Sequence, residues 1–553
     1  GGGLGGCGLG DWSGGRRAVG ARDFKSMMPR REKLMASRGG EAAPTEEPKQ
    51  ARADAGGAPR VLNSIQEVEA YAKDAGLTAL CFEDDLTLAN KDGWALIPLR
   101  QDLLSEGLEP EEAFAALMPL LRKEGRLRVF GAKQLLHTLE PMGIRVEGTC
   151  VRDDAMLAGF LLNPLKPAKT LADLTDGETG AAALWMLCEA QEKALEDSGM
   201  MALYREMELP LMCVLLDMER NGFLVDRAEL ERLGKQFSTS EKQLREDIIE
   251  LTGGIPFNLN SPKQLGEVLF ERLGLPPGRK TKSGYSTDAE TLEGLKGFHP
   301  AIEKILDYRQ VAKLNATYID GLTQQIESDG RVRTRFDQTV AVTGRLSSNE
   351  PNLQNIPVRT PMGREIRRAF IARDGWTLVD ADYSQIELRI LAHFSGDAAM
   401  VDAFTSGQDI HTRTAAEVYG VPLYEVTPAM RSASKAVNFG IVYGISDFGL
   451  ARNIGVSRKE AAEFIARYFE RYPGVKRYMD KAVAGGTALG YAETMFGRRR
   501  PLPELCSSNC KTRAFGERAA RNRPVQGTAA DIVKLAMVHV HRKLSARGFA
   551  AQL

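Results

Sequence analysis

Residues 427–444 constrain the fold more than any other segment, because they read as one helix with a chemically ordered face. Thr427 followed by Pro428 predicts the helix start, since Thr caps a first turn and Pro is tolerated within it. At about 100° per residue, side chains four apart drift by only about 40° and form one slowly winding stripe. The members of this stripe are Arg431, Lys435, Phe439 and Tyr443.

Two cations at one end of the stripe and two aromatic rings at the other fit a nucleoside triphosphate lying along the helix. Arg431 would offer a planar fork to phosphate oxygens and Lys435 a point charge. The base or sugar would then lie against Phe439. Taken alone, the segment equally allows a basic surface face beside a core-facing aromatic residue.

The distribution of charge favours a polyanionic partner, although the net charge of the whole chain is zero. Residues 331–553 hold 33 Lys and Arg against 21 Asp and Glu, a net charge of +12, so the preceding part carries −12. Such asymmetry indicates a nucleic-acid-binding region beside an acidic one. No stretch approaches the roughly 18 continuous apolar residues of a membrane span, so no membrane partner is expected. Seven scattered cysteines fit reduced thiols in the cytoplasm.

At 553 residues the chain requires several domains. Residues 1–59 are rich in Gly, Ala and charged residues and predict a disordered segment or linker. An α/β domain is expected over 60–198, with strands near 77–82 and 94–99 and helices near 111–118 and 155–162. Long amphipathic helices follow to about residue 330, one of them stopping at Asn221-Gly222.

Residues 376–391 predict a short apolar strand followed by a helix, with Asp382 at the junction. An exposed carboxylate at a strand end suits a magnesium ligand. A helix N-cap is the alternative role for such an Asp.

Three further segments suit contacts with nucleic acid. Residues 343–357 and 518–531 are dense in Arg, Asn and Gln, which suit the acceptors of the minor groove. Residues 278–284 form a basic loop flanked by Gly, which could grip a phosphate backbone. Each of the three, alone, could also be a solvated polar surface.

The strings at 343–357, 376–391, 427–444 and 518–531, in this order and spacing, resemble those of bacterial-type family A DNA polymerases, and the resemblance runs from about residue 60 to 553. It implies an α/β multidomain, right-hand architecture preceded by a degenerate ribonuclease H-like 3′→5′ exonuclease domain at 60–198. The thumb would be 199–340, the palm 341–410, the fingers 411–500, and the remainder of the palm 501–553.

The resemblance also implies a role for each matching residue. Asp382 and the backbone carbonyl of Tyr383 would bind metal, two Mg²⁺ ions for which Mn²⁺ can substitute. The deoxynucleotide would be held by His411, Arg431, Lys435, Phe439 and Tyr443, with Glu387 and Gln385 beside the sugar and Glu387 crowding a 2′-hydroxyl. The DNA contacts would be Arg345, Asn352, Gln354, Arg518, Asn522, Gln526, Lys280 and Lys282.

The implied function is template-directed DNA synthesis from dNTPs in replication or repair, on primer–template DNA, by a monomer of the bacterial cytoplasm associated with the nucleoid. A single-subunit RNA polymerase is disfavoured by Glu387 and Phe439. A nuclease would need metal ligands that residues 80–198 lack.

Two departures from the family pattern alter the expectation. In the family, the second palm carboxylate lies in a His-Asp-Glu string. That string does not occur in this sequence, and the chain stops within the strand that would precede it. We therefore expect an incomplete sequence and a polypeptide that is inactive or impaired, with primer–template binding lacking catalysis as the alternative. In the exonuclease-like domain, the first strand runs into Glu83-Asp84-Asp85 without Asp-x-Glu, and only Asp154 matches a later ligand. Asp23-Phe24-Lys25-Ser26 resembles the tail of a preceding 5′-nuclease domain.

Overall fold

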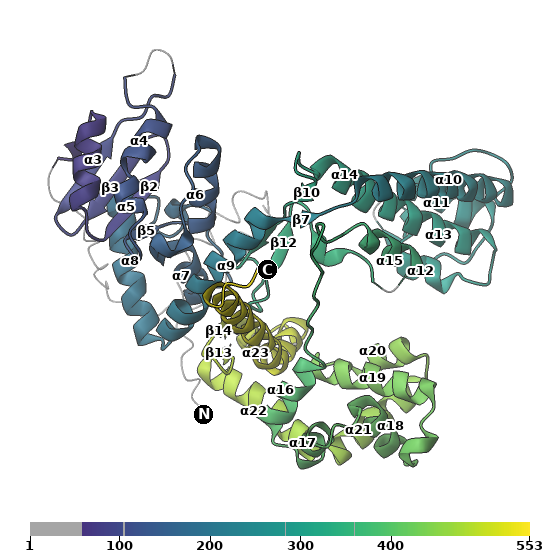
Figure 1. Ribbon diagram of the computed structural model, residues 1–553. Coiled ribbons are helices and arrows are strands. Elements are labelled where there is room, and N and C mark those ends of the chain that lie inside the picture. Colours follow the sequence, from purple (N-terminus) through teal and green to yellow (C-terminus); the bar gives the residue numbers. More distant parts are fainter. Residues whose placement is uncertain (1–57, 103–105, 282–283, 359) are drawn as a thin grey trace, which may run out of the picture.

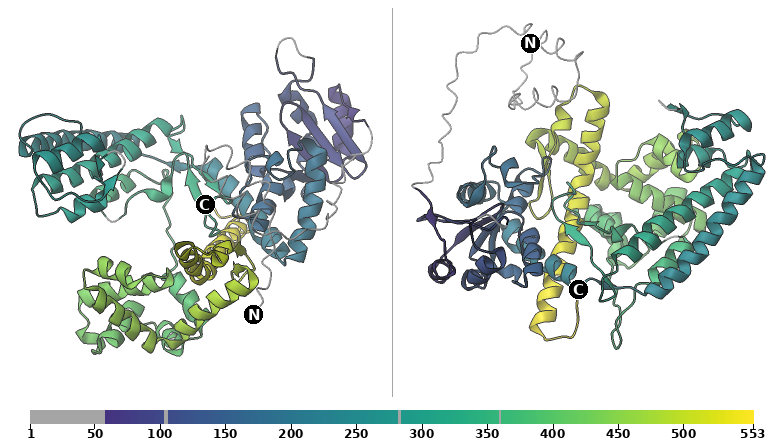
Figure 2. Two further views of the ribbon diagram at one scale, coloured as in Figure 1. Left: turned by 180° about the vertical axis from the view of Figure 1, so that it is seen from behind. Right: turned by 90° about the horizontal axis from the view of Figure 1, so that it is seen from above.

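In the computed structural model, an α/β domain and two helical arms surround one long helix, α23 (Cys510–Ala546) (Figure 1). The structure describes residues 58–102, 106–281, 284–358 and 360–553. The expected N-terminal linker, up to residue 57, and Lys282 lie outside these residues. Views from behind and from above show both arms projecting away from the α/β domain (Figure 2).

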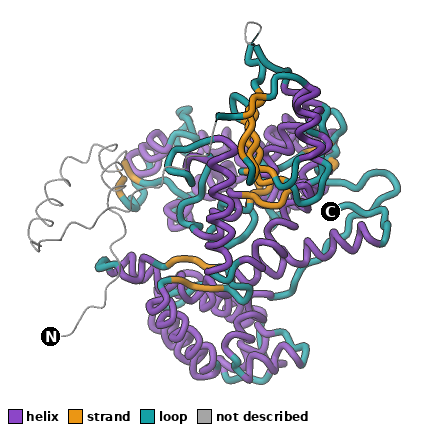
Figure 3. The backbone as a smooth tube through the Cα atoms, turned by 90° about the vertical axis from the view of Figure 1, so that its left-hand side faces the viewer, coloured by secondary structure: helices purple, strands orange, loops and turns teal. Residues whose placement is uncertain are grey.

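The α/β domain is built on a six-stranded mixed sheet of order β1-β4-β3-β2-β5-β6. Strands β2, β3 and β4 pair antiparallel, whereas β5 and β6 continue from β2 in parallel. Most of the longer strands lie in this domain, and helices dominate the rest (Figure 3). The strands are Arg60–Val61 (β1), Thr78–Phe82 (β2), Leu86–Asn90 (β3), Gly93–Ile97 (β4), Leu127–Val129 (β5) and Val151–Asp154 (β6). The expected strands near 77–82 and 94–99 are thus confirmed.

The helices of this domain begin where the sequence provides caps. Ser64 and Glu67 form a capping box at the start of α3, which satisfies two backbone donors. The helices are Ile65–Asp74 (α3), Pro110–Ala116 (α4), Met118–Leu121 (α5), Ala132–Leu139 (α6), Ala155–Leu162 (α7) and Gly180–Asp197 (α8). Both helices expected here are present, as α4 and α7.

Helix α9 (Leu209–Asn221), preceded by a π-helical turn at Leu203–Glu208, joins the domain to the remainder of the chain. Met212 and Leu216 belong to the core of the α/β domain, whereas Leu211 and Leu215 pack with Val538 of α23. The helix ends as expected at Gly222, whose φ of +58° a side chain would strain.

The first arm spans residues 227–325 and lies within residues 199–340. Its longest helix, α10, packs along α13, and the buried residues of α10 recur at helical spacing on one face. Its helices are Arg227–Leu251 (α10), Pro262–Gly266 (α11), Ala289–Gly294 (α12), Ala301–Leu314 (α13) and Gly321–Gln325 (α14). Short strands at Lys280–Thr281 (β8) and Gly284–Tyr285 (β9) form a hairpin, and β7 (Phe223–Leu224) pairs with β10 (Arg331–Val332) at the base.

Next come a hairpin of β11 (Arg335–Asp337) and β12 (Ser347–Asn349), then α15 (Pro361–Arg368) and α16 (Ile386–Ser395). The second arm, residues 398–489, shares one buried core with α16 and with Val525 and Ala529 of α23. Its helices are Ala398–Thr405 (α17), Ile410–Tyr419 (α18), Pro428–Val442 (α19), Asp447–Ile454 (α20), Arg458–Arg471 (α21) and Pro473–Leu489 (α22). The hairpin of β13 (Tyr491–Glu493) and β14 (Arg499–Pro501) then leads into α23.

Close packing around α23 depends on small residues. A Cβ on Gly527 would lie 2.5 Å from Cγ2 of Thr494 and 3.5 Å from the carbonyl oxygen of Thr343. A Cβ on Gly516 would lie 2.9 Å from the backbone nitrogen of Leu505. The helix therefore sits directly against the β13–β14 hairpin and the segment before β12, which brings distant parts of the sequence to one place.

Among the described residues, no helix is both long enough and apolar enough to span a bilayer.

Candidate nucleotide and nucleic-acid site

The stripe expected on residues 427–444 is present on α19. Thr427 is the N-cap, and its hydroxyl accepts a hydrogen bond from the backbone nitrogen of Met430. Arg431, Lys435 and Tyr443 are exposed and Phe439 is half-buried. Arg431 forms an ion pair with Asp409, in which Nε of Arg431 donates to Oδ2 of Asp409 at 2.6 Å. That contact lowers the pKa of Asp409, despite its partial burial, to about 2.

His411 lies behind the stripe, with its ring centroid 5.7 Å from that of Phe439. The side chain is buried, and burial lowers the pKa of His411 below its ordinary value. Asn438 donates from Nδ2 to Nδ1 of His411 across 3.1 Å, which leaves the proton of a neutral ring on Nε2. The hydroxyl of Thr414 also accepts from Asn438 at 3.2 Å. This polar core keeps His411 neutral and fixed in orientation.

Glu387 connects α16 to α19. Tyr443 donates its hydroxyl to Oε2 of Glu387 at 2.8 Å, and Arg345 pairs with Oε1 of the same carboxylate. Burial, followed by this hydrogen bond, raises the pKa of Tyr443. The structure thus brings together Glu387, which is expected to crowd a 2′-hydroxyl, Arg345, which is expected to contact DNA, and Tyr443 at the end of the stripe.

The strand expected in the first part of residues 376–391 is absent, and this prediction was wrong. Residues 376–383 form no regular element, and Val379 is 90% exposed. A strand requires a neighbouring strand for its backbone hydrogen bonds, and among the described residues none pairs with this segment. Helix α16 does follow, and it starts after Gln385, whose φ of +53° places it in the left-handed region.

Asp382 and Tyr383 are both exposed, and within the described part of the chain no hydrogen bond or ion pair engages the Asp382 carboxylate. Asp382 is not the N-cap of α16, which is Gln385. A free carboxylate of this kind can take a cation. No group of three or more His, Cys, Asp or Glu side chains with metal-binding geometry exists among the described residues.

Three of the expected DNA contacts lie on α23. Arg518 is exposed, and its Cγ would lie 3.0 Å from a Cβ on Gly444, immediately after the stripe. Asn522 and Gln526 follow at one-turn intervals and are half-buried. The structure therefore places Arg518 beside Gly444, which follows α19 and Tyr443.

The remaining expected contacts are on loops and on the first arm. Asn352 caps a 3₁₀ turn through its Oδ1, which accepts from the backbone nitrogen of Gln354 at 3.1 Å. Gln354 in turn donates to the carbonyl of Leu346 at 3.4 Å. Lys280 lies on the β8–β9 hairpin with its Nζ 5.9 Å from the ring centroid of Tyr285, so it belongs to the first arm and not to the cluster around α19.

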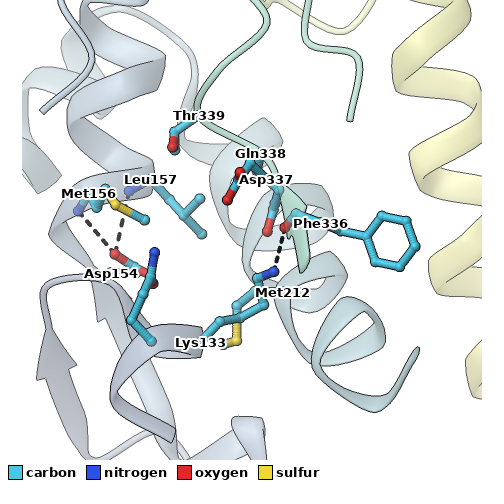
Figure 4. Close-up of a pocket in the computed structure, with 10 residues that line it drawn as sticks. Lys133, Asp154, Met156, Leu157, Met212, Phe336, Asp337, Gln338 and Thr339 are labelled. Atoms are coloured by element: carbon cyan, nitrogen blue, oxygen red, sulfur yellow. Dashed lines mark hydrogen bonds between the residues drawn. The ribbon is translucent and has the colours of Figure 1, made fainter. Parts of the chain in front are cut away.

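Asp154, which the resemblance allowed as a metal ligand, instead serves as the N-cap of α7. Its carboxylate accepts four backbone hydrogen bonds, from Gly131, Ala132, Met156 and Leu157. Figure 4 shows it at a narrow pocket where the α/β domain meets residues 336–339. On the other side of this pocket, Lys133 donates to the carbonyl of Phe336. The pocket lies between the α/β domain and residues 336–339, and the Asp154 carboxylate beside it is already engaged in four backbone hydrogen bonds.

A buried ionic network below the site was not foreseen. Glu208 accepts from both Arg498 and Lys534, and Arg498 also pairs with Asp531 at 2.7 Å. All four side chains are below 10% exposure. The two cations hold the pKa of Glu208 far below its ordinary value in spite of burial. Arg498 also lies directly under Gly344, where a Cβ would be 2.8 Å from its Nε, and so supports the residue next to Arg345.

Comparison with known proteins shows the family of this chain. The model of "DNA polymerase family A" matches residues 227–553. The chain belongs to DNA polymerase family A. DNA polymerase I of Bacillus subtilis is 44% identical over 458 residues, covering 77% of this chain and 52% of that protein. The corresponding protein of Lactococcus lactis subsp. lactis is 49% identical over 434 residues, covering 77% and 47%.

This family A chain thus spans about half the length of the curated relatives it matches. A solved structure, the polymerase domain of Pol1 from M. smegmatis in complex with DNA primer–template and dNTP, aligns with a TM-score of 0.80. It is 37% identical, and the alignment covers 90% of each chain. The expected family and right-hand polymerase fold are confirmed.

Sequence reasoning missed Asn438, Asp409 and Glu208. Asn438 carried a usable signal, since it is a polar residue between the apolar Val437 and the stripe residue Phe439. Asp409, two residues before His411, could have been noted as a helix N-cap. Glu208 carried no such signal, because its partners lie 290 and 326 residues away.

Proposed function

We propose that this chain carries out template-directed DNA synthesis, joining deoxynucleotides from dNTPs to the 3′-hydroxyl of a primer. The hydrogen bond between Tyr443 and Glu387 supports this most directly. It places the end of the cationic and aromatic stripe of α19 against the helix that follows Asp382. The polymerase domain from M. smegmatis, which was solved with primer–template and dNTP, has the same fold.

In this proposal the triphosphate lies on Arg431 and Lys435, and Arg431 exchanges Asp409 for phosphate oxygens. His411 presents its Nε2 proton beside them. Phe439 and Tyr443 take the sugar and base, while Glu387, with Gln385 before it, crowds a 2′-hydroxyl and selects deoxynucleotides. Arg345, Asn352, Gln354, Arg518, Asn522 and Gln526 contact the primer–template, with Lys280 and Lys282 as phosphate contacts from the first arm.

Asp382 and the carbonyl of Tyr383 would hold Mg²⁺, or Mn²⁺ in its place, because Asp382 is exposed and its carboxylate forms no hydrogen bond or ion pair with the described residues. A bound pair of such ions activates the 3′-hydroxyl and stabilises the departing pyrophosphate. A two-ion site needs a further carboxylate, and the sequence contains no His-Asp-Glu string to provide it. The described residues therefore fit part of the ligand set. We propose that this polypeptide binds primer–template but catalyses DNA synthesis poorly.

We further propose that residues 60–198 form a degenerate, inactive exonuclease-like domain with a structural role. Its mixed sheet with helices on its faces supports this, as does the full use of Asp154 in backbone hydrogen bonds. The right-hand division into thumb, palm and fingers at the residues stated above, a monomeric state, and a cytoplasmic, nucleoid-associated setting complete the proposal.

The test is primer extension with Mg²⁺ and four dNTPs, alongside primer–template binding by fluorescence anisotropy. Both are measured on this polypeptide and on the protein as its gene encodes it. We expect primer–template binding, with little synthesis by a chain that lacks the His-Asp-Glu string. Lys435→Ala should weaken dNTP-dependent synthesis, whereas Lys459→Ala, on the exposed face of α21, is the control. Absence of both binding and synthesis in the protein as its gene encodes it would refute the proposal; binding alone would favour a DNA-binding relative.

A further inference from the structure

Arg523 stands one turn before Gln526 on α23 and is a residue to which the proposed function assigns no role. Its Nη1 donates to Oε1 of Gln526 at 3.3 Å. This is the only hydrogen bond found for the Arg523 side chain within the described residues, and no carboxylate there forms an ion pair with it. The donor and acceptor groups of these two residues therefore determine how the Gln526 amide is oriented.

A guanidinium has donors and no acceptor, so it fixes which end of a neighbouring amide faces it. Gln526 must turn its oxygen toward Arg523 and its NH₂ group away. The alternative orientation would place donor against donor. Arg523 therefore makes Gln526 a donor on its remaining side.

The minor groove of DNA requires such a donor. Every base pair presents acceptors there, N3 of purines and O2 of pyrimidines, so only a donor can contact all four pairs alike. An amide flipped the other way would set its oxygen against these acceptors. A reader that serves any sequence must therefore be held in one orientation.

We infer that Arg523 is a positioning residue that sets the side-chain amide of Gln526 so that its NH₂ group faces the minor-groove acceptors of the primer–template. This rests on the proposed function, in which Gln526 contacts DNA. Arg523 acts through Gln526 and needs no contact with DNA itself.

The surroundings of Arg523 hold it in this role. Arg500, its cationic neighbour, is buried and committed to Glu504 through two hydrogen bonds of 2.8 and 2.6 Å. The Nε of Arg523 is buried without a partner, so the outer end of the guanidinium makes its polar contact. Burial and the nearby charges of Arg500 and Arg345 lower the pKa of Arg523, yet an arginine remains a cation at neutral pH.

The experiment compares binding of primer–templates that carry guanine or 3-deazaguanine, which lacks N3, at the primer terminus or at its template partner. Dissociation constants come from fluorescence anisotropy, so no turnover is needed. We expect wild-type protein to bind the guanine duplex about threefold to tenfold more tightly for at least one position, the worth of one neutral hydrogen bond. Gln526→Ala should reduce this ratio to about one.

Arg523→Ala and Arg523→Met should reduce the ratio in the same way, and adding Gln526→Ala should cause no further change, because the two residues act as a unit. Met keeps the apolar packing of the arginine stem if the Ala variant does not fold. Arg521→Ala is the matched control: Arg521 is on the same helix, pairs with Glu517 at 3.5 Å, and should leave the ratio unchanged.

The outcomes separate the inference from the proposed function. If wild type discriminates and Gln526→Ala does not, but both Arg523 variants still discriminate, the inference is overturned and the proposed function stands. Equal loss of affinity for both duplexes in the Arg523 variants would make Arg523 a phosphate contact and also overturn it. If wild type shows no discrimination at either position, the DNA contact proposed for Gln526 fails and the inference fails with it, whereas DNA synthesis is decided by the primer-extension test.

Discussion

Tyr443 and Glu387, which lie 56 residues apart in the chain, share a 2.8 Å hydrogen bond. The second oxygen of the same carboxylate pairs with Arg345. One buried carboxylate therefore links the second arm to the segment that carries Arg345.

Removal of this link should weaken nucleotide binding. Tyr443→Phe loses a hydrogen bond to a charged group, worth about 1.5–3 kcal/mol when both partners are held. We expect weaker dNTP affinity in complexes of the protein, as its gene encodes it, with primer–template, measured by titration of single-nucleotide incorporation. Tyr424→Phe is the control, because Tyr424 is 85% exposed. An unchanged affinity in Tyr443→Phe would show that the link has no part in nucleotide binding.

Glu387→Ala should admit ribonucleotides. The substitution removes the side chain proposed to crowd a 2′-hydroxyl, so the ratio of dNTP to rNTP incorporation should fall at least about tenfold, as expected when one steric contact worth about 1.4 kcal/mol is lost. Single-nucleotide incorporation with matched dNTP and rNTP measures the ratio. Glu425→Ala, in a connecting turn of the second arm, should keep it.

Acid should loosen the packing of α18 on α19 through His411. Burial lowers the pKa of His411, so the folded state disfavours the charged ring. The associated stability is complete above the unfolded pKa, about 6.5, and is lost as pH falls below that value towards the folded pKa. Hydrogen exchange of α18 and α19, corrected for intrinsic rates, should show less protection at pH 5 than at pH 7.5.

His411→Gln should abolish this dependence between pH 7.5 and 5, since the amide does not titrate. Asp409 acts in a separate window: its pKa is lowered to about 2, so its contribution is present above the unfolded value near 4 and is lost only below it. A full pH response remaining in His411→Gln would assign the effect to other groups.

Glu208→Gln should be strongly destabilising. It removes the carboxylate that faces both Arg498 and Lys534 in a buried site, and breaking one partner of a buried pair costs about 3–5 kcal/mol. Urea unfolding followed by circular dichroism should show a lower midpoint. Glu206→Gln, two residues earlier and exposed, should leave the midpoint in place.

Two helical glycines should respond oppositely to alanine. Gly527→Ala would force a Cβ to 2.5 Å from Cγ2 of Thr494, which is held by a 2.7 Å hydrogen bond to Asp531, and should cost about 1–3 kcal/mol. Gly485→Ala on α22 meets nothing within 4 Å and should be neutral or stabilising by up to about 1 kcal/mol. Comparison of the two urea midpoints tests this; equal midpoints would contradict it.

Sequence analysis succeeded where the information was local. The cap at Thr427, the four-residue stripe and the stop at Gly222 all depend on neighbours within a few positions, and all are present. The strand expected in the first part of residues 376–391 is absent, because a β-branched and apolar run cannot by itself supply a pairing partner. The network of Glu208, Arg498 and Lys534 could not be foreseen, since nothing near each residue indicates a partner hundreds of positions away.

Helix α9 is packed on two sides. One side completes the core beneath the β-sheet, and the other side packs on α23, which bears the residues proposed to read DNA. Residues 60–198 are therefore tied to the polymerase region by shared packing, whatever chemistry they perform. Excision of residues 60–198 would therefore expose the apolar side chains of Met212 and Leu216 on α9 to water and weaken the support of α23.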